Sequence, residues 1–180
     1  LNGRDNHPVL MVTRNDAQAY ARWLGRSLPT EAQWEFAAKA GSNDVALDEV
    51  PRDPAGKPAA NFWQGVFPYV NHQEDGYAGS APVGCYGANA WGLHDMIGNA
   101  WEWTQDRYRG PHQPHGNGDP RAAMAQQGHT TSPAESMVIK GGSYLCAENY
   151  CMRYRAAARH PQEANLPTAH VGFRTVAVAD

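Results

Sequence analysis

The chain has 180 residues, and its 15 basic and 18 acidic residues give a formal net charge of −3. Only 18% of the residues are charged and 42% are hydrophobic, which excludes a coiled coil and a charge-driven disordered chain. The charge balance also argues against nucleic acid or an anionic membrane surface as a partner, and no window approaches the roughly 18 uncharged apolar residues of a membrane span.

The composition predicts a loop-rich fold. The chain contains 18 Gly, 13 Pro and 6 Trp, and such a mix favours turns that large aromatic side chains anchor. Three cysteines cannot form a disulfide framework. We find no internal repeat and no linker, so residues 1–180 are expected to form a single domain. The chain starts at Leu1 without a signal-peptide pattern, and we expect that it lacks the natural N-terminus, so its targeting cannot be inferred.

The first predicted helix covers residues 15–24. Polar residues at its start suit an N-terminus, and Gly25 suits the position after the last turn. The expected apolar stripe at helical spacing consists of Ala19, Tyr20, Trp23 and Leu24.

The second predicted helix begins after Leu28-Pro29, with Thr30 as its N-cap. Thr30 and Gln33 have the spacing of a capping box, and Gly41 marks the end. The expected apolar face consists of Ala32, Phe36 and Ala40, flanked by Trp34, Ala37 and Ala38.

The rest of the chain predicts short strands among loops. Residues 43–60 are a charged loop, and no helical or strand period persists between 42 and 136. Residues 104–136 read as a long surface excursion that contains His112, His115 and His129. Strands are expected at 137–140 and 152–156, with a weaker signal at 172–176. Helices followed by scattered antiparallel strands indicate an α+β domain.

The most distinctive pair of reactive residues is Cys146 and Cys151. An offset of five residues points the two side chains apart on a helix or a strand, so they can meet only if 147–150 form a loop. Three interpretations stay open on spacing alone: two unrelated buried thiols, a redox disulfide, or a two-thiolate site that suits Cu(I) better than zinc. Nearby arginines at 153, 155 and 159 could activate a thiol or hold a peptide, although at least one is expected to pair with a carboxylate instead.

Two oxygen-rich loops, 61–77 and 95–102, could bind calcium. Neither has EF-hand spacing, so solvated turn carboxylates are the better expectation from the pattern alone. Trp101 and Trp103 are expected to be core anchors. His112 and His115 lie among Pro and Gly, which favours a solvated loop, and Cys85 reads as a buried single thiol.

Several motifs occur together in one order. They are residues 28–35 (LPTEAQWE), 61–65 (NFWQG), 74–77 (EDGY), 98–103 (GNAWEW), 141–146 (GGSYLC) with Cys151, and 172–174 (GFR). Together they resemble the sulfatase-modifying-factor family, and within it the formylglycine-generating enzymes. The cysteine-containing segment is the specific part, because relatives with other activities tend to lack the cysteine pair.

This resemblance implies a variant C-type-lectin-like α+β fold with little regular secondary structure. It also implies a copper-dependent oxidase that uses O₂ to convert a cysteine in an unfolded Cys-x-Pro-x-Arg segment of a sulfatase to Cα-formylglycine. Cys146 and Cys151 would hold Cu(I), and the substrate thiolate would join them as a third ligand.

The resemblance further implies the residues of three sites. The catalytic pocket would contain Cys146, Cys151, Ser143, Tyr150, Arg153 and Trp101. One structural Ca²⁺ would be held by Asn61, Asp75 and the carbonyl groups of Phe62 and Tyr77. A second cation would be held by Asp95, Glu102 and the carbonyl groups of Gly98 and Ala100.

Three features differ from the family pattern. We expect that this chain lacks the N-terminal stretch of the same domain that supplies strands and pocket residues in family members. Ala21, Ala38, Ala156 and Thr175 replace the cysteines that staple secretory-pathway members, which suggests a prokaryotic form without structural disulfides. A cytoplasmic location and a monomeric state are also expected. His170 stands where Asn is common. Two alternatives to the oxidase remain: a tailoring enzyme of the same fold, of the siderophore-maturation or sulfoxide-synthase type, and a calcium-stabilised binding module without catalysis.

Overall fold

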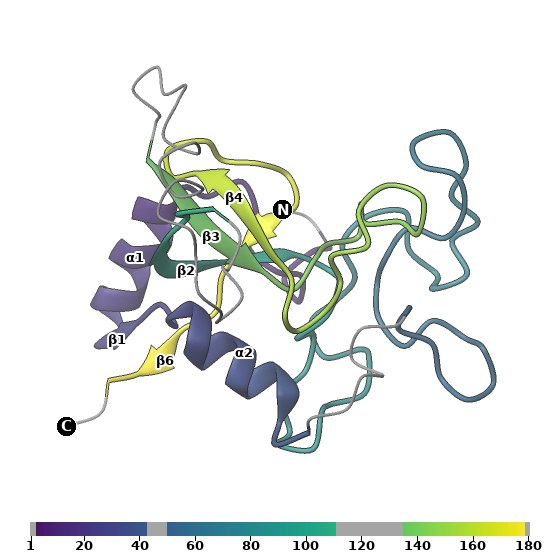
Figure 1. The fold of residues 1–180 in the computed structure, drawn as a ribbon, viewed down its shortest axis with the longest axis horizontal. Coiled ribbons are helices and arrows are strands. Elements are labelled where there is room, and N and C mark those ends of the chain that lie inside the picture. Colours follow the sequence, from purple (N-terminus) through teal and green to yellow (C-terminus); the bar gives the residue numbers. More distant parts are fainter. Residues whose placement is uncertain (1–2, 43–49, 111–134, 179–180) are drawn as a thin grey trace, which may run out of the picture.

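The structure is a computed structural model that describes residues 3–42, 50–110 and 135–178 (Figure 1). It contains two α-helices and two small sheets, so the predicted α+β class is confirmed. The predicted loop residues 43–49, most of the predicted surface excursion and its three histidines lie outside the described residues. Neither helix in the described part of the chain has the length and hydropathy needed to cross a membrane.

Helix α1 (Arg14–Trp23) ends as predicted but buries a different face. Thr13 caps its start through a reciprocal pair of hydrogen bonds with Asp16, and Gly25 follows the last turn with φ +68°. The predicted apolar stripe is wrong, because Trp23 is 77% exposed whereas Ala17 and Ala21 are fully buried. Two small side chains let the helix backbone lie close to the core, and the large rings stay outside.

Helix α2 (Glu31–Lys39) has the predicted capping box between Thr30 and Gln33. Its buried face is again not the predicted one: Phe36 is 65% exposed, whereas Trp34 and Ala38 are buried. Trp34 is drawn inward because its indole Nε1 donates a hydrogen bond to the buried Glu102 carboxylate at 2.7 Å. A buried hydrogen-bond partner therefore decides which face of α2 is buried, and the helical spacing of its hydrophobic residues does not.

The larger sheet has the order β4-β3-β2-β5. Strand β3 (Ser136–Lys140), which confirms a prediction, pairs antiparallel with both β2 (Trp101–Arg107) and β4 (Arg159–Glu163). The short β5 (Val171–Gly172) pairs parallel with β2. The second sheet joins β1 (Arg26–Ser27) to β6 (Val176–Ala177), so the weak strand signal at 172–176 corresponds to two separate short strands.

Two strand predictions fail for physical reasons. Strand β2 was missed because residues 101–104 are all buried, and a strand covered on both faces shows no alternation. Trp101 and Trp103 are core anchors, as expected. The strand expected at 152–156 is absent: this segment runs as a loop over Gly142, where an added Cβ would lie 2.8 Å from Tyr154 Cα.

The loops of residues 50–100 extend away from the sheet on the side opposite α1 (Figure 1). They contain only isolated β-bridges in the described part, so other hydrogen bonds must hold them. The buried Asn99 side chain provides several. Its Oδ1 accepts from Asn61 Nδ2 at 3.1 Å and from the Ala81 N–H at 2.9 Å, and its Nδ2 donates to the Ala81 carbonyl at 3.2 Å. We call these three residues the Asn99 hub.

The main chain of the Asn99 hub completes the connection. Asn99 N–H donates to the Asn61 carbonyl at 2.8 Å, and the Asn99 carbonyl accepts from the Tyr144 N–H at 3.1 Å. The neighbouring Gly98 must be glycine, because its φ is +76° and an added Cβ would lie 2.4 Å from the Asn61 oxygen. The hub therefore joins the loops around residues 61, 81 and 99 to the loop that follows β3.

We expect Asn99→Ala to lower the free energy of unfolding by about 2–4 kcal/mol, because it leaves the N–H and the carbonyl of the buried Ala81 without their side-chain partners and removes one of the two hydrogen bonds of Asn61 Nδ2. Urea unfolding measures this change. The matched control is Asn165→Ala, which removes one exposed side-chain hydrogen bond of 3.4 Å and should cost less than about 0.5 kcal/mol. Equal losses in the two variants would contradict the role of the hub.

Candidate active site

The two cysteines predicted to meet do meet. A tight turn brings them together, in which the Ala147 carbonyl accepts from the N–H groups of Tyr150 at 3.2 Å and Cys151 at 3.0 Å. Cys146 Sγ then donates a hydrogen bond to Cys151 Sγ at 2.9 Å. Both cysteines are free thiols, Cys146 is 1% exposed and Cys151 is half-buried. The predicted loop at 147–150 is confirmed.

The surroundings make the two thiols chemically different. The hydrogen bond from Cys146 and the positive charge of Arg153 lower the pKa of Cys151 to about 7. The same hydrogen bond, together with burial, raises the pKa of Cys146. At neutral pH the pair therefore shares one proton, with the thiolate on the more exposed sulfur, where an incoming group can reach it.

An open cavity of about 420 Å³ lies over the cysteine pair. Its lining includes all six predicted catalytic residues, namely Ser143, Cys146, Tyr150, Cys151, Arg153 and Trp101, and four that the sequence analysis did not assign to the pocket, Phe67, Leu145, His160 and His170. We call it the cysteine cavity. His170 was noted only as a departure from a family pattern, Leu145 lies within the 141–146 motif without an assigned role, and no motif marked Phe67 or His160.

One wall of the cysteine cavity is aromatic. The rings of Phe67 and Tyr150 stack with centroids 4.4 Å apart and an angle of 15°. The Asn149 side chain fixes the stack, because it accepts from the Phe67 N–H at 3.2 Å and donates to the Phe67 carbonyl at 3.4 Å. Since Tyr150 is 68% exposed, this wall continues from the cavity to the protein surface.

Another part of the lining of the cysteine cavity consists of polar groups held by Trp101. The Trp101 ring stacks on the His160 ring with centroids 5.6 Å apart, and its main-chain N–H donates to the His170 carbonyl at 2.9 Å. Ser143 Oγ lies 3.1 Å from His170 Nδ1, and Arg153 Nη1 lies 2.7 Å from His160 Nδ1. Burial lowers the pKa of both histidines, so both are neutral at pH 7.

The other two arginines near the cysteines are not part of this cavity. Arg159 forms an ion pair with Glu31 at 2.9 Å, which confirms the expectation that at least one arginine pairs with a carboxylate. Cys85 is exposed rather than buried, and it lies beside the Tyr77 hydroxyl. The interpretation of Cys85 as a buried thiol was wrong, because the loop that carries it lies at the surface.

The first predicted oxygen site is assembled by one loop pair. Asp75 accepts from the N–H groups of Phe62 at 3.2 Å and Tyr77 at 3.0 Å, and from the Gln64 side chain at 2.8 Å. Asn61 lies next to Phe62 and is 1% exposed, with its Nδ2 directed to Gly79 and Asn99. The four residues predicted for calcium thus lie together, and Gln64 is an additional member that the sequence analysis missed.

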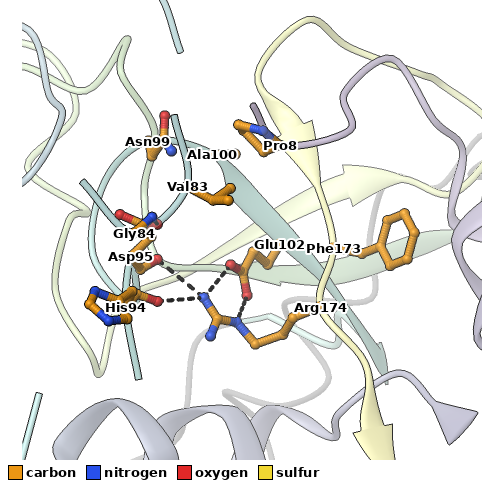
Figure 2. Close-up of a pocket in the computed structure, with 10 residues that line it drawn as sticks. All are labelled: Pro8, Val83, Gly84, His94, Asp95, Asn99, Ala100, Glu102, Phe173 and Arg174. Atoms are coloured by element: carbon orange, nitrogen blue, oxygen red, sulfur yellow. Dashed lines mark hydrogen bonds and ion pairs between the residues drawn. The ribbon is translucent and has the colours of Figure 1, made fainter. Parts of the chain in front are cut away.

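In the second predicted cation site, the Glu102 carboxylate already binds other groups of the protein. Figure 2 shows the Arg174 guanidinium directed at Glu102, with bonds of 2.5 and 2.7 Å, and at the main-chain carbonyls of His94 and Asp95. Trp34 donates to the same carboxylate, and the Asp95 side chain accepts from the Gly84 N–H at 2.7 Å. Gly98 and Ala100 lie beside these residues in the chain. A guanidinium already neutralises Glu102, so a second cation stays a prediction.

No group of three or more His, Cys, Asp or Glu side chains that could hold a metal ion occurs within the described ranges. A two-thiol site contains only two such side chains. A calcium site built from carbonyl and amide oxygens around one carboxylate contains only one, so neither kind of site would form a group of three.

Comparisons with known proteins identify related sequences and a related fold. Residues 1–179 match the family described as Sulfatase-modifying factor enzyme 1-like domain. The chain is 47% identical over 178 residues to a Mycobacterium tuberculosis protein named formylglycine-generating enzyme, a match that covers 97% of this chain and 58% of that protein. It is also 43% identical over 107 residues to a Bos taurus protein named inactive C-alpha-formylglycine-generating enzyme 2, covering 59% of this chain and 35% of that one.

A solved structure shows the same fold. PvdO from Pseudomonas aeruginosa superposes with a TM-score of 0.67 at 24% sequence identity, over 94% of this chain and 61% of that chain. At this identity the likeness concerns the fold alone.

We expect the metal-free protein to show alkylation of Cys151 that rises with pH through a midpoint of about 7, because the thiolate is the reactive form. Partial burial of its sulfur and the nearby charges of Asp95 and Asp75 raise the pKa of Cys85, so alkylation of this thiol should need a more alkaline pH. Iodoacetamide labelling followed by peptide mass spectrometry measures both midpoints in one sample. A Cys151 midpoint at or above that of Cys85 would contradict the assignment of the thiolate.

Proposed function

The chain belongs to the family of Sulfatase-modifying factor enzyme 1-like domains, and from this we propose that it is an oxidase that converts a cysteine in a sulfatase Cys-x-Pro-x-Arg segment to Cα-formylglycine. The chain spans 58% of the M. tuberculosis relative's length, so the activity is a proposal for this chain. The observation that supports it is the meeting of Cys146 and Cys151 at the base of an open cavity.

The two sulfur atoms suit Cu(I) as a cofactor. Cu(I) prefers soft sulfur ligands and low coordination numbers, and Cys151 is already a thiolate near neutral pH. Cys146 would lose its proton on metal binding, as thiol ligands do. When bound, copper would supply redox chemistry with O₂ next to the substrate sulfur.

The residues of the chain would prepare this centre and the peptide. Arg153 stabilises the Cys151 thiolate through its positive charge. Ser143, fully buried, accepts from the Leu145 N–H at 3.3 Å and so fixes the turn that carries Cys146. The Phe67–Tyr150 stack forms an apolar wall that excludes water from one side of the reacting cysteine, and Trp101 supports the other side.

A structural role is proposed for calcium. Asn61, Asp75 and the carbonyl groups of Phe62 and Tyr77 are all oxygen ligands of the kind that Ca²⁺ takes from loops, and hydrogen bonds bring three of the four into contact with one another. The loops they belong to have no sheet ladder to support them. A cation at this point would join residues 61–62 to residues 75–77.

The alternatives lack a supporting observation of equal weight. A tailoring enzyme related to PvdO in fold, or a calcium-stabilised binding module, would have no use for two coupled thiols in a cavity. Because a 43% identical relative is named inactive, family membership alone does not decide the matter, and the cysteine pair does most to favour the oxidase.

We expect Cys146→Ser and Cys151→Ser each to reduce aldehyde formation to below about 1% of wild type, because loss of a metal ligand costs more than the tenfold to hundredfold typical of outer-shell changes. The assay incubates a Cys-x-Pro-x-Arg peptide in air with the copper-loaded protein and detects the aldehyde by hydrazine trapping and mass spectrometry. Competition with a chromophoric Cu(I) chelator should show the same loss of binding.

Cys85→Ser is the matched control, because this thiol lies outside the cysteine cavity. It should keep wild-type turnover and copper affinity. Near-normal turnover in either of the other two variants would exclude the proposed mechanism.

We expect calcium at about 100 times its dissociation constant to raise the melting temperature by about 5–10 °C, since such binding contributes about 2.7 kcal/mol. Thermal unfolding with and without a calcium chelator measures the shift. Asp75→Ala should remove it, whereas Asp53→Ala, which alters a turn at 53–57, should retain it. An Asp75→Ala protein with the full calcium-dependent shift would refute this site.

A further inference from the structure

The proposed chemistry assigns no role to two histidines that line the cysteine cavity. His160 lies on β4 opposite Ile139 of β3, and His170 immediately precedes β5. They come from different segments of the chain, yet both line the cavity, and Trp101 contacts both, one through its ring and one through its main chain. Two imidazoles held by one anchor form an organised surface.

The hydrogen bonds assign the tautomer of His160 and restrict that of His170. A guanidinium can only donate, so His160 Nδ1 accepts from Arg153 at 2.7 Å and the ring proton lies on Nε2. Ser143 Oγ accepts from the Leu145 N–H at 3.3 Å and lies 3.1 Å from His170 Nδ1. When the Ser143 hydroxyl donates to Nδ1, His170 also carries its proton on Nε2.

The Nε2 atoms of both histidines are available to a ligand. Neither atom has a hydrogen-bond partner among the residues that the structure describes, and neither is a fully buried atom without a partner. Both residues are half-buried and line the cysteine cavity. The lining of the cavity thus includes two neutral imidazole rings that can each offer an Nε2–H group.

An extended peptide would need such donors. When a cysteine enters the cavity, the carbonyl groups on either side of it leave water and must find new hydrogen bonds. The ring faces of the aromatic wall offer none, the sulfur atoms are engaged with each other, and one amino group of Arg153 is engaged with His160. A neutral imidazole N–H can serve a neutral carbonyl without the cost of burying an additional charge.

We propose that Ser143 donates to His170 Nδ1, and that the Nε2–H groups of His160 and His170 bind main-chain carbonyl oxygens of the substrate peptide next to the reacting cysteine. This inference rests on the proposed function, since it assigns a subsite within the same cavity. It makes the two histidines substrate-binding residues that act on the peptide main chain and are therefore indifferent to the variable side chains of the segment.

Peptide binding to the metal-free protein tests this subsite without turnover. The probe is a fluorescein-labelled Cys-x-Pro-x-Arg peptide in which Ser replaces the reacting Cys, and fluorescence anisotropy gives its dissociation constant. His160→Phe and His170→Phe keep a ring but remove the donor, and each should weaken binding about fivefold, the effect of one hydrogen bond of about 1 kcal/mol. His94→Phe, whose ring lies in the separate pocket of Figure 2, should bind as wild type does.

Two further measurements separate binding from a structural effect. His160→Gln and His170→Gln retain an N–H donor and should recover most of the affinity. A thioamide in place of the carbonyl next to the serine should weaken binding to wild type but not to the Phe variant of the histidine that contacts it. In turnover assays the Phe variants should raise KM with little change in kcat.

The outcomes distinguish this inference from the proposed function. Normal aldehyde formation with peptide affinity unchanged in both Phe variants would overturn the subsite alone. Absence of aldehyde with histidine-dependent peptide binding would overturn the oxidase and support the subsite. No peptide binding by wild type would overturn both. If inorganic phosphate at millimolar concentration displaces the peptide from wild type, the histidines form an anion site and the carbonyl assignment is wrong.

Discussion

The fold depends on buried hydrogen bonds between loops, and the Asn99 hub is the centre of them. In most domains a sheet ladder satisfies the buried backbone groups, but here the described residues 50–100 contain only isolated bridges. The side chains of Asn61 and Asn99 replace the missing ladder. Through the Tyr144 N–H the same hub also holds the turn that carries the cysteines, so the position of the cysteine pair and the stability of the loops share one cause.

Buried charges join helix α2 to the larger sheet. Lys140 of β3 is fully buried and lies 3.2 Å from Glu35 and 3.7 Å from Glu31 of α2, while Glu102 of β2 binds Arg174 and the Trp34 indole. Burial lowers the pKa of Lys140, and the two carboxylates oppose that shift. Each of these charges has a partner, as burial requires. These networks are structural, and none of these charged residues lines the cysteine cavity.

Within the cysteine cavity, the sheet and the loops supply different residues. The sheet supplies the rigid parts, with Trp101 on β2 and His160 on β4. The loops supply the thiols and the aromatic wall, which Asn149 fixes to Phe67. In the proposed oxidase, the loop residues would hold the metal ion, and the residues that Trp101 anchors would orient the peptide.

The sequence by itself determined the local features: the capping box of Thr30 and Gln33, the stop at Gly25, strand β3, the turn at 147–150 and the six residues assigned to the pocket by family resemblance. These follow from a few neighbouring residues or from motifs. The buried faces of both helices, strand β2 and the loop at 152–156 were decided by tertiary structure, because distant partners such as Glu102 for Trp34 and Gly142 for Tyr154 override local periodicity. His160 could not be predicted for the same reason: only the pairing of β4 with β3 and the Trp101 ring bring it to the cysteines, and no sequence pattern encodes a contact between segments that far apart.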